Sequence, residues 1–347
     1  MLETKPNLLW ISYLRVFSTV AVIFLHASSP LVSSYKTLTF SAWNTANFFD
    51  AVSRFCVPVF VMISGALLFN KNLEIGQFFK KRVIRILLPF IFWSICYALY
   101  VIFIKTDFYK TASFLEIIKK IVRSVYFGSA YHLWYIYMLL GLLLIVPILN
   151  FWVIRAKKKE IHYFLIIWFV TLLVKNFKIG AFMPNIELSF FSEYTGYLVL
   201  GYYLSTIEIK NIRKFQLTSL VLFIFGILMT FIGTCFLTIF QKKLNTSLYD
   251  FFSLNVLISS IGLFLFFRSS DLFNRKQNWI CSQINQYSYG IYLTHVLVLW
   301  TLENIGINGL LFSPFVGIPL TVFLCLLIAL CIVKILNLTK FGSYVSG

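Results

Sequence analysis

The 347-residue chain has little charge, and acidic residues are the scarcest part of it: 12 Asp and Glu stand against 30 Lys and Arg. Charged residues make up 12% of the chain and hydrophobic residues 60%. A soluble domain needs a polar surface that this composition cannot supply, which excludes the class of soluble globular proteins. We therefore expect an all-α polytopic membrane protein, whose spans are runs of about 20 apolar residues.

Several motifs are also missing. The chain has no P-loop, which excludes the usual means of ATP hydrolysis, and no His-Glu-x-x-His or Cys-x-x-Cys, the common zinc signatures. Its six cysteines lie in or beside apolar segments, so we predict packing residues without a disulfide framework. The four histidines come with no carboxylate cluster, and no metal site is predicted.

Hydrophobic runs predict about ten transmembrane helices in one domain that spans residues 1–347. Lys and Arg fall mostly in the short loops that lie inside if both termini are cytoplasmic, so this topology is predicted. It also explains the net charge of +18 without a nucleic-acid partner. The predicted spans are 8–29, 48–69, 86–104, 132–152, 161–176, 193–207, 215–239, 252–267, 285–302 and 314–336.

A basic segment at 105–123 departs from this charge distribution, because it falls on the predicted outer side. Apolar residues from Phe114 to Val125 follow helical spacing, and Ser113-x-x-Glu116 has the form of a capping box. This pattern predicts an amphipathic helix that lies on the outer membrane surface.

The first span carries two ionisable side chains, Arg15 and His26. Eleven residues at about 100° each bring the two to within roughly 20° of alignment, about 16 Å apart along the helix. An arginine at such depth costs about 2.5–3.5 kcal/mol, so it usually marks function. A neutral imidazole can take a proton from a hydroxyl, which makes His26 a candidate general base; a structural histidine is the alternative.

The second span contains Arg54, at a depth near that expected for His26. A buried guanidinium there could stabilise an oxyanion, whereas an outward course to the lipid headgroups is the alternative. Farther along this span, Ser64 and Gly65 would allow a neighbouring helix to approach closely.

Three further groups of residues could bind ligands. Lys80, Lys81, Arg82 and Arg85 form a compact basic cluster that suits phosphates, although anionic lipid would explain it equally well. The segments 131–137 and 288–295 each contain a further histidine. An aromatic belt is the simpler explanation of the first segment, and a buried hydrogen bond that of the second. Their candidate residues are His132, Trp134, Tyr137, Tyr292 and His295.

Four of these segments, in order, resemble the motifs of the acyltransferase 3 family of membrane-bound acyltransferases. Arg15 and His26 match its Arg-x10-His motif, and residues 53–65 (SRFCVPVFVMISG) match the pattern of its second helix. Residues 131–135 (YHLWY) and 288–295 (SYGIYLTH) match its later motifs. The chain is most similar to the bacterial inner-membrane O-acetyltransferases that modify surface polysaccharides.

The resemblance implies a multi-pass protein of the bacterial inner membrane that uses an acyl-CoA, most simply acetyl-CoA, as co-substrate with no bound cofactor. The acceptor would be a hydroxyl of a cell-surface or lipid-linked glycan, and membrane lipid the other partner. With the spacing above, it suggests catalytic roles for His26, Arg15 in the donor path and Arg54 at the oxyanion. Lys80, Lys81, Arg82 and Arg85 would bind acyl-CoA, and His132, Trp134, Tyr137, Tyr292 and His295 would line the acceptor site or pore.

A transporter or flippase of a lipid-linked sugar or acyl donor is the competing interpretation, because buried Arg and His would serve it as well. The absence of evident inverted repeats and the Arg-x10-His match favour the enzyme. Direct transfer and an acyl-histidine intermediate both stay open.

Overall fold

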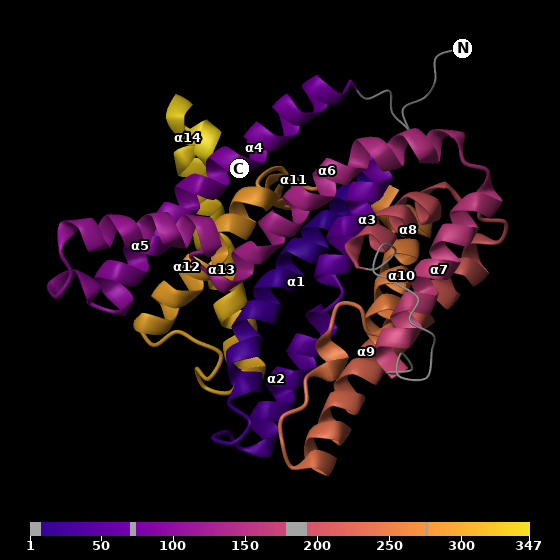
Figure 1. Cartoon of the computed structure of the whole chain (residues 1–347). Helices are drawn as coiled ribbons and strands as arrows, with labels where there is room; N and C mark the ends of the chain where they lie inside the picture. The colour runs from indigo at the N-terminus through magenta and orange to yellow at the C-terminus, as the bar shows by residue number, and fades with distance from the viewer. Residues whose placement is uncertain (1–7, 70–73, 178–192, 275–276) are drawn as a thin grey trace. The chain divides into compact units, whose positions relative to one another are not determined.

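The computed structural model describes residues 8–69, 74–177, 193–274 and 277–347, and within these ranges the chain is helical and contains no strand (Figure 1). The helices are α1 (Leu9–Ser33), α2 (Phe40–Ser53), α3 (Cys56–Leu68), α4 (Ile75–Tyr100), α5 (Phe114–Phe127), α6 (Trp134–Arg155), α7 (Lys158–Phe177), α8 (Tyr194–Thr206), α9 (Ile212–Gln241), α10 (Leu254–Ser269), α11 (Trp279–Gln286), α12 (Ser288–Asn304), α13 (Pro314–Leu336) and α14 (Lys340–Val345). Short helical turns are η1 (Val101–Lys105), η2 (Phe108–Lys110), η3 (Tyr131–Leu133), η6 (Ser247–Tyr249) and η7 (Asp271–Asn274).

The prediction of an all-α polytopic membrane protein is confirmed. Each of the ten predicted spans overlaps one or two helices, and in the part of the chain that the structure describes, eight helical segments are long and apolar enough to cross a membrane, with α2 and α3 together forming one of them. The helices α8 and α12, with 13 and 17 residues, are shorter than these eight. The number ten and the cytoplasmic position of both termini stay predictions.

The second predicted span, 48–69, is wrong in its boundaries. The apolar stretch already begins at Phe40 and divides into α2 and α3, with a turn at Arg54 and Phe55. Pro58 explains the break, because in a continuous helix the N–H of residue 58 would bond the carbonyl of Arg54, and proline has no N–H. In the first turn of α3, by contrast, proline costs no helical hydrogen bond.

The described helices form two compact units. The first comprises residues 1–71, 148–286 and 307–322, and the second residues 72–147, 287–306 and 323–347. The prediction of a single domain is not tested by this division.

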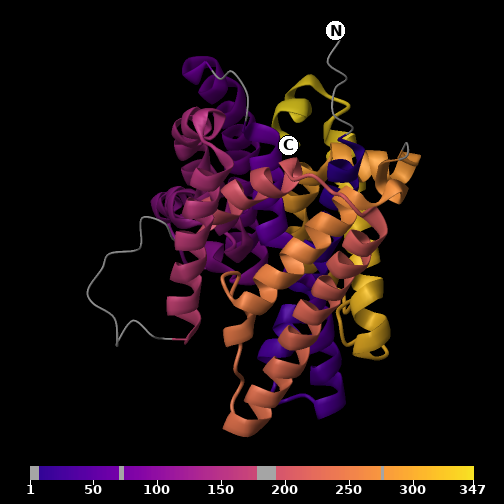
Figure 2. The same cartoon turned by 90° about the vertical axis from the view of Figure 1, so that its right-hand side faces the viewer.

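In the first unit, glycines let helices approach closely. A Cβ atom on Gly65 of α3 would lie 1.8 Å from the carbonyl oxygen of Leu198 in α8, and one on Gly201 of α8 would lie 2.1 Å from that of Met62 in α3. The pair α9 and α10, orange in Figure 2, is built in the same way around Gly226 and Gly262. Small residues at helix contacts are typical of membrane proteins, so the expectation for Gly65 is confirmed.

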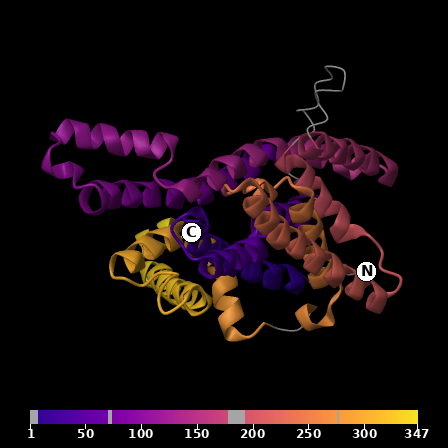
Figure 3. The same cartoon turned by 90° about the horizontal axis from the view of Figure 1, so that it is seen from below.

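In the second unit, α4 packs against α5, α12 and α14, and Figure 3 shows α5 running beside α4. Buried aromatic and aliphatic side chains fill the core, and the Trp93 indole N–H donates to the carbonyl of Val345 at 3.0 Å. The core residues are Phe90, Trp93, Tyr97, Leu133, Ile136, Leu293 and Val296.

The predicted amphipathic helix is α5, and the capping box at its start is confirmed. The Ser113 N–H and hydroxyl both donate to the Glu116 carboxylate at 2.7 Å, and the Glu116 N–H donates back to the Ser113 oxygen at 3.4 Å. These hydrogen bonds favour the ionised carboxylate and hold the pKa of Glu116 below its usual range.

Replacement of Gly65 by Ala tests the close contact of α3 with α8. The added Cβ would overlap the Leu198 carbonyl, so we expect a loss of stability of about 1–3 kcal/mol or more, the usual cost of overpacking. The measurement is thermal unfolding of the detergent-solubilised protein. Gly141→Ala in α6 is the matched control, since a Cβ there meets nothing within 4 Å; equal unfolding temperatures for both variants would contradict the contact.

Candidate active site

Arg15 and His26 project from one uninterrupted helix, α1. Thr19 and Val22 lie between them on the same strip of the helix surface, and both are buried, whereas Arg15 and His26 are half-buried. The Thr19 hydroxyl bonds back to the Arg15 carbonyl at 2.8 Å. The strip is therefore buried or half-buried along its length, as the cost of burying an arginine led us to expect.

Arg15 is held at one end of this strip by α11. Its Nη1 donates to the side-chain oxygen of Asn285 at 3.2 Å. Asn285 is a neutral amide, so this contact orients the guanidinium without neutralising it. The hydrogen bond fixes Arg15 to the helix bundle, and its role in the donor path stays a prediction.

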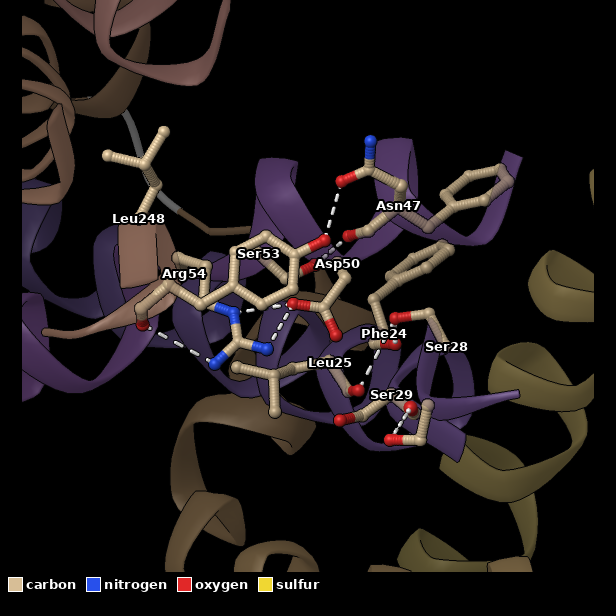
Figure 4. A network of polar contacts seen from close by, with 12 residues as sticks. Phe24, Leu25, Ser28, Ser29, Asn47, Asp50, Ser53, Arg54 and Leu248 are labelled. Carbon is tan, nitrogen blue, oxygen red and sulfur yellow. Dashed lines mark hydrogen bonds and ion pairs between the residues drawn. The ribbon is translucent and has the colours of Figure 1, made fainter. Parts of the chain in front are cut away.

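Arg54 is enclosed by a network that the sequence analysis did not foresee, drawn in Figure 4. Its guanidinium forms an ion pair with Asp50, one helical turn earlier, whose side chain is fully buried. A third nitrogen, Nη1, points to the carbonyl of Tyr249 at 3.5 Å, and the guanidinium lies over the Tyr249 ring at 4.1 Å. The Tyr249 hydroxyl donates to Asn47, which in turn donates to the carbonyl of Phe231.

This network ties α2 to the η6 turn and to α9. With 13% of its side chain exposed, Arg54 does not take the outward course to the headgroups that the sequence left open. The α1 side chains drawn beside Asp50 include Leu25 and Ser28, and helical geometry directs His26 about 160° away from Ser28. The contacts of Arg54 are therefore structural, and its role at an oxyanion stays a prediction.

Asp50 is the residue that sequence reasoning missed. The signal was present, because Asp50 is one of only 12 acidic residues and lies four positions before Arg54. That spacing brings two side chains onto one helix face, where opposite charges pair.

The second unit gathers the other predicted histidines and aromatic residues. His132, from η3, and His295, from α12, are both buried, and their rings lie edge to face with centroids 5.0 Å apart. The Tyr292 hydroxyl donates to the carbonyl of His132, and His295 Nδ1 lies 2.6 Å from the carbonyl of Tyr292. The structure thus brings His132, Tyr292 and His295 together in one cluster.

Tyr97 of α4 joins this cluster and was also missed. Its hydroxyl donates to the Leu293 carbonyl and accepts from the Leu297 N–H, each at 2.9 Å. In a regular helix the Leu297 N–H would donate to the Leu293 carbonyl. The Tyr97 hydroxyl thus takes the place of a helical hydrogen bond in α12, beside the two histidines. From the other side, the Cys325 thiol donates to the His295 carbonyl at 3.3 Å.

Trp134 and Tyr137 lie at the edge of this cluster and are exposed. The Tyr137 hydroxyl donates to the carbonyl of Val125 at 2.7 Å, which fastens α6 to the end of α5. This contact is structural, and Trp134 has the exposure of a residue in an aromatic belt.

The basic cluster belongs to α4 itself, because that helix begins at Ile75, well before the predicted span. All four side chains are exposed, and none forms an ion pair with a residue of the described ranges. They carry their charge on the first three turns of the helix, available to phosphate groups. The cluster consists of Lys80, Lys81, Arg82 and Arg85.

The remaining chemistry of the described residues is sparse. Nowhere in those ranges do three His, Cys, Asp or Glu side chains gather in a group suited to a metal ion. His162, the fourth histidine, is exposed and lies 2.8 Å from the Tyr203 hydroxyl, which agrees with a peripheral role.

A family model described as an acyltransferase domain, the acyltransferase 3 model, matches residues 8–334. The chain belongs to the acyltransferase 3 family. The match covers nearly the whole chain and supports an acyltransferase activity in a multi-pass membrane protein. No curated protein and no solved structure matches this acyltransferase significantly.

Loss of the Asp50 charge tests the network around Arg54. Asp50→Asn leaves a buried guanidinium without its counter-ion, and we expect a loss of about 3–5 kcal/mol of stability, measured as thermal unfolding in detergent. Asp50→Leu combined with Arg54→Met removes both charges and should recover most of that loss. If Asp50→Asn unfolds at the wild-type temperature, the pair does not stabilise α2.

Proposed function

We propose that this acyltransferase moves an acetyl group from acetyl-CoA to a hydroxyl of a cell-surface or lipid-linked glycan at the bacterial inner membrane. The observation that carries the proposal is the buried strip of α1, which aligns a fixed guanidinium at Arg15 with an imidazole at His26, three turns away. Acyl transfer needs both a base and a positive charge for the donor, and this strip supplies the two on one rigid element.

In the proposed reaction, a neutral His26 accepts the proton of the sugar hydroxyl as its oxygen attacks the thioester carbonyl. The tetrahedral intermediate then collapses, the carbon–sulfur bond breaks, and the coenzyme A thiolate takes the proton back from the imidazolium. Arg15 binds the polar part of the incoming donor. An acyl-histidine intermediate would use the same residues in two steps, with the imidazole as nucleophile.

The basic cluster of α4 supports an acyl-CoA donor in this proposal. Coenzyme A carries a diphosphate and a further phosphate, and arginine binds phosphate through paired hydrogen bonds. The four exposed cations, with no ion pair among the described residues, supply that chemistry at the start of a helix.

The cluster of His132, Tyr292 and His295 supports a sugar-binding role in the second unit. Aromatic faces suit the apolar faces of sugar rings, and exposed Trp134 and Tyr131 continue the aromatic surface. Nothing in the geometry favours the transporter interpretation, whereas the family match favours acyl transfer.

Transfer of radiolabelled acetyl from acetyl-CoA to a glycan fraction, by membranes with matched protein levels, tests His26. His26→Ala should lower the rate by at least about 100-fold, the usual contribution of a general base. His162→Ala is the matched histidine control and should keep wild-type activity, because His162 is exposed and its ring lies beside the Tyr203 hydroxyl. Substantial activity in His26→Ala would rule out His26 both as the general base and as the nucleophile.

Arg82→Gln combined with Arg85→Gln tests the donor site. We expect KM for acetyl-CoA to rise by about ten-fold or more for each arginine, with kcat largely kept, because phosphate binding does not change during the chemical step. Arg213→Gln with Lys214→Gln, at the exposed start of α9, removes the same charge elsewhere and should leave KM unchanged. An equal rise in KM in both double variants would mean that the net charge of the protein, and not a donor site on α4, sets the affinity for acetyl-CoA.

A further inference from the structure

A pocket of about 500 Å³ lies beside α5, and none of its lining residues is among those proposed for acyl transfer. It is lined by residues of α5, by Gly128 just after this helix and by Phe108 of the η2 turn. Two of its cations lie over these rings, Lys120 over Phe108 at 4.5 Å and Arg123 over Phe127 at 5.9 Å. Aromatic rings thus hold cations along the pocket.

The pocket is positively charged. Lys119, Lys120 and Arg123 line it, and none of the three forms an ion pair with a residue of the described ranges. The one acidic residue in the lining, Glu116, already accepts two hydrogen bonds from Ser113 in the capping box. The lining therefore has three positive charges and one negative charge, and its carboxylate is already hydrogen-bonded, so the pocket suits an anion.

Next to these cations, α5 exposes an apolar stripe. Leu115, Ile118, Val122 and Tyr126 follow each other at spacings of three and four residues and are 60%, 41%, 63% and 75% exposed. Around the helix, this stripe and the cations lie about 100° apart, and Ile117, Ile121 and Ser124 occupy the remaining side. The same helix therefore offers an apolar surface and an anion site side by side.

We propose that this pocket binds the phosphate group of an anionic phospholipid, whose acyl chains lie along the exposed stripe of α5. A soluble anion would leave the stripe in water, and a neutral lipid would leave three cations without a counter-charge. An anionic amphiphile satisfies both, and phosphate with one or two acyl chains is the commonest such group in a membrane. The inference does not depend on the acyl-transfer chemistry of the protein.

The consequence is that α5 holds a defined position at the membrane surface. Its remaining side packs against α4, and Tyr137 of α6 bonds the carbonyl of Val125 near its end. Lipid bound at the pocket would thus fix the depth of a helix that is joined to the core of the second unit.

Native mass spectrometry of the purified full chain in detergent tests the site, with phosphatidylglycerol as probe and phosphatidylcholine as the neutral comparison. The variant that carries Lys119→Gln, Lys120→Gln and Arg123→Gln should bind phosphatidylglycerol on the order of 100-fold more weakly, about five-fold for each cation lost. Lys36→Gln with Lys242→Gln and Lys243→Gln removes the same charge from exposed positions outside the pocket and should bind like the wild type.

Further arms separate the possible outcomes. Lys119→Arg with Lys120→Arg and Arg123→Lys keeps the charge and should keep binding, which separates the pocket from a folding defect. Equal loss in the pocket variant and in the control outside it would overturn the proposal, as would undiminished binding by the pocket variant. Equal affinity for glycerol phosphate would assign a soluble anion instead, and binding of polyprenyl diphosphate without phosphatidylglycerol would assign a lipid-linked substrate. Measured on His26→Ala, the lipid affinity should be unchanged, so this test is independent of transfer activity.

Discussion

A charge within an apolar helix needs a partner from the chain itself, because neither lipid nor hydrocarbon side chains can solvate it. Each arginine buried in the first unit meets this need differently. Arg54 pairs with Asp50, Arg268 donates to the carbonyls of Leu204 and Ile207 at the end of α8, and Arg15 donates to Asn285. Because these partners come from distant parts of the chain, each arginine fixes a helix contact that apolar packing alone would leave free to slide.

The same need limits what each arginine can do chemically. Three nitrogens of Arg54 are bonded to Asp50 and to the Tyr249 carbonyl, and the guanidinium lies over the Tyr249 ring. Arg15 donates to a neutral amide, which orients its guanidinium. An arginine that already has a buried counter-ion gains little from a passing substrate. The ion pair with Asp50 therefore limits what Arg54 can contribute at an oxyanion.

Close packing of helices follows from backbone contact as well as from side chains. Gly65 and Gly201 let α3 and α8 touch at their carbonyls, and a buried hydroxyl such as that of Thr230 bonds the carbonyl four residues earlier. Both devices satisfy polar groups without water, which membrane helices require. In the second unit, the Tyr97 hydroxyl does this for α12 and places a polar group next to two buried histidines.

The amino-acid sequence by itself determined what depends on neighbours along the chain: the helical class, the alignment of Arg15 with His26, the capping box of α5 and the family, since hydropathy, helical period and motif order are local properties. It also contained the reason for the break at Arg54, in Pro58, and the Asp50–Arg54 spacing. Only the tertiary structure decided which distant groups meet: Asn285 with Arg15, Tyr249 with Arg54, and His132 with both Tyr97 and His295. Such contacts depend on how helices far apart in the chain pack, and no local pattern specifies that packing.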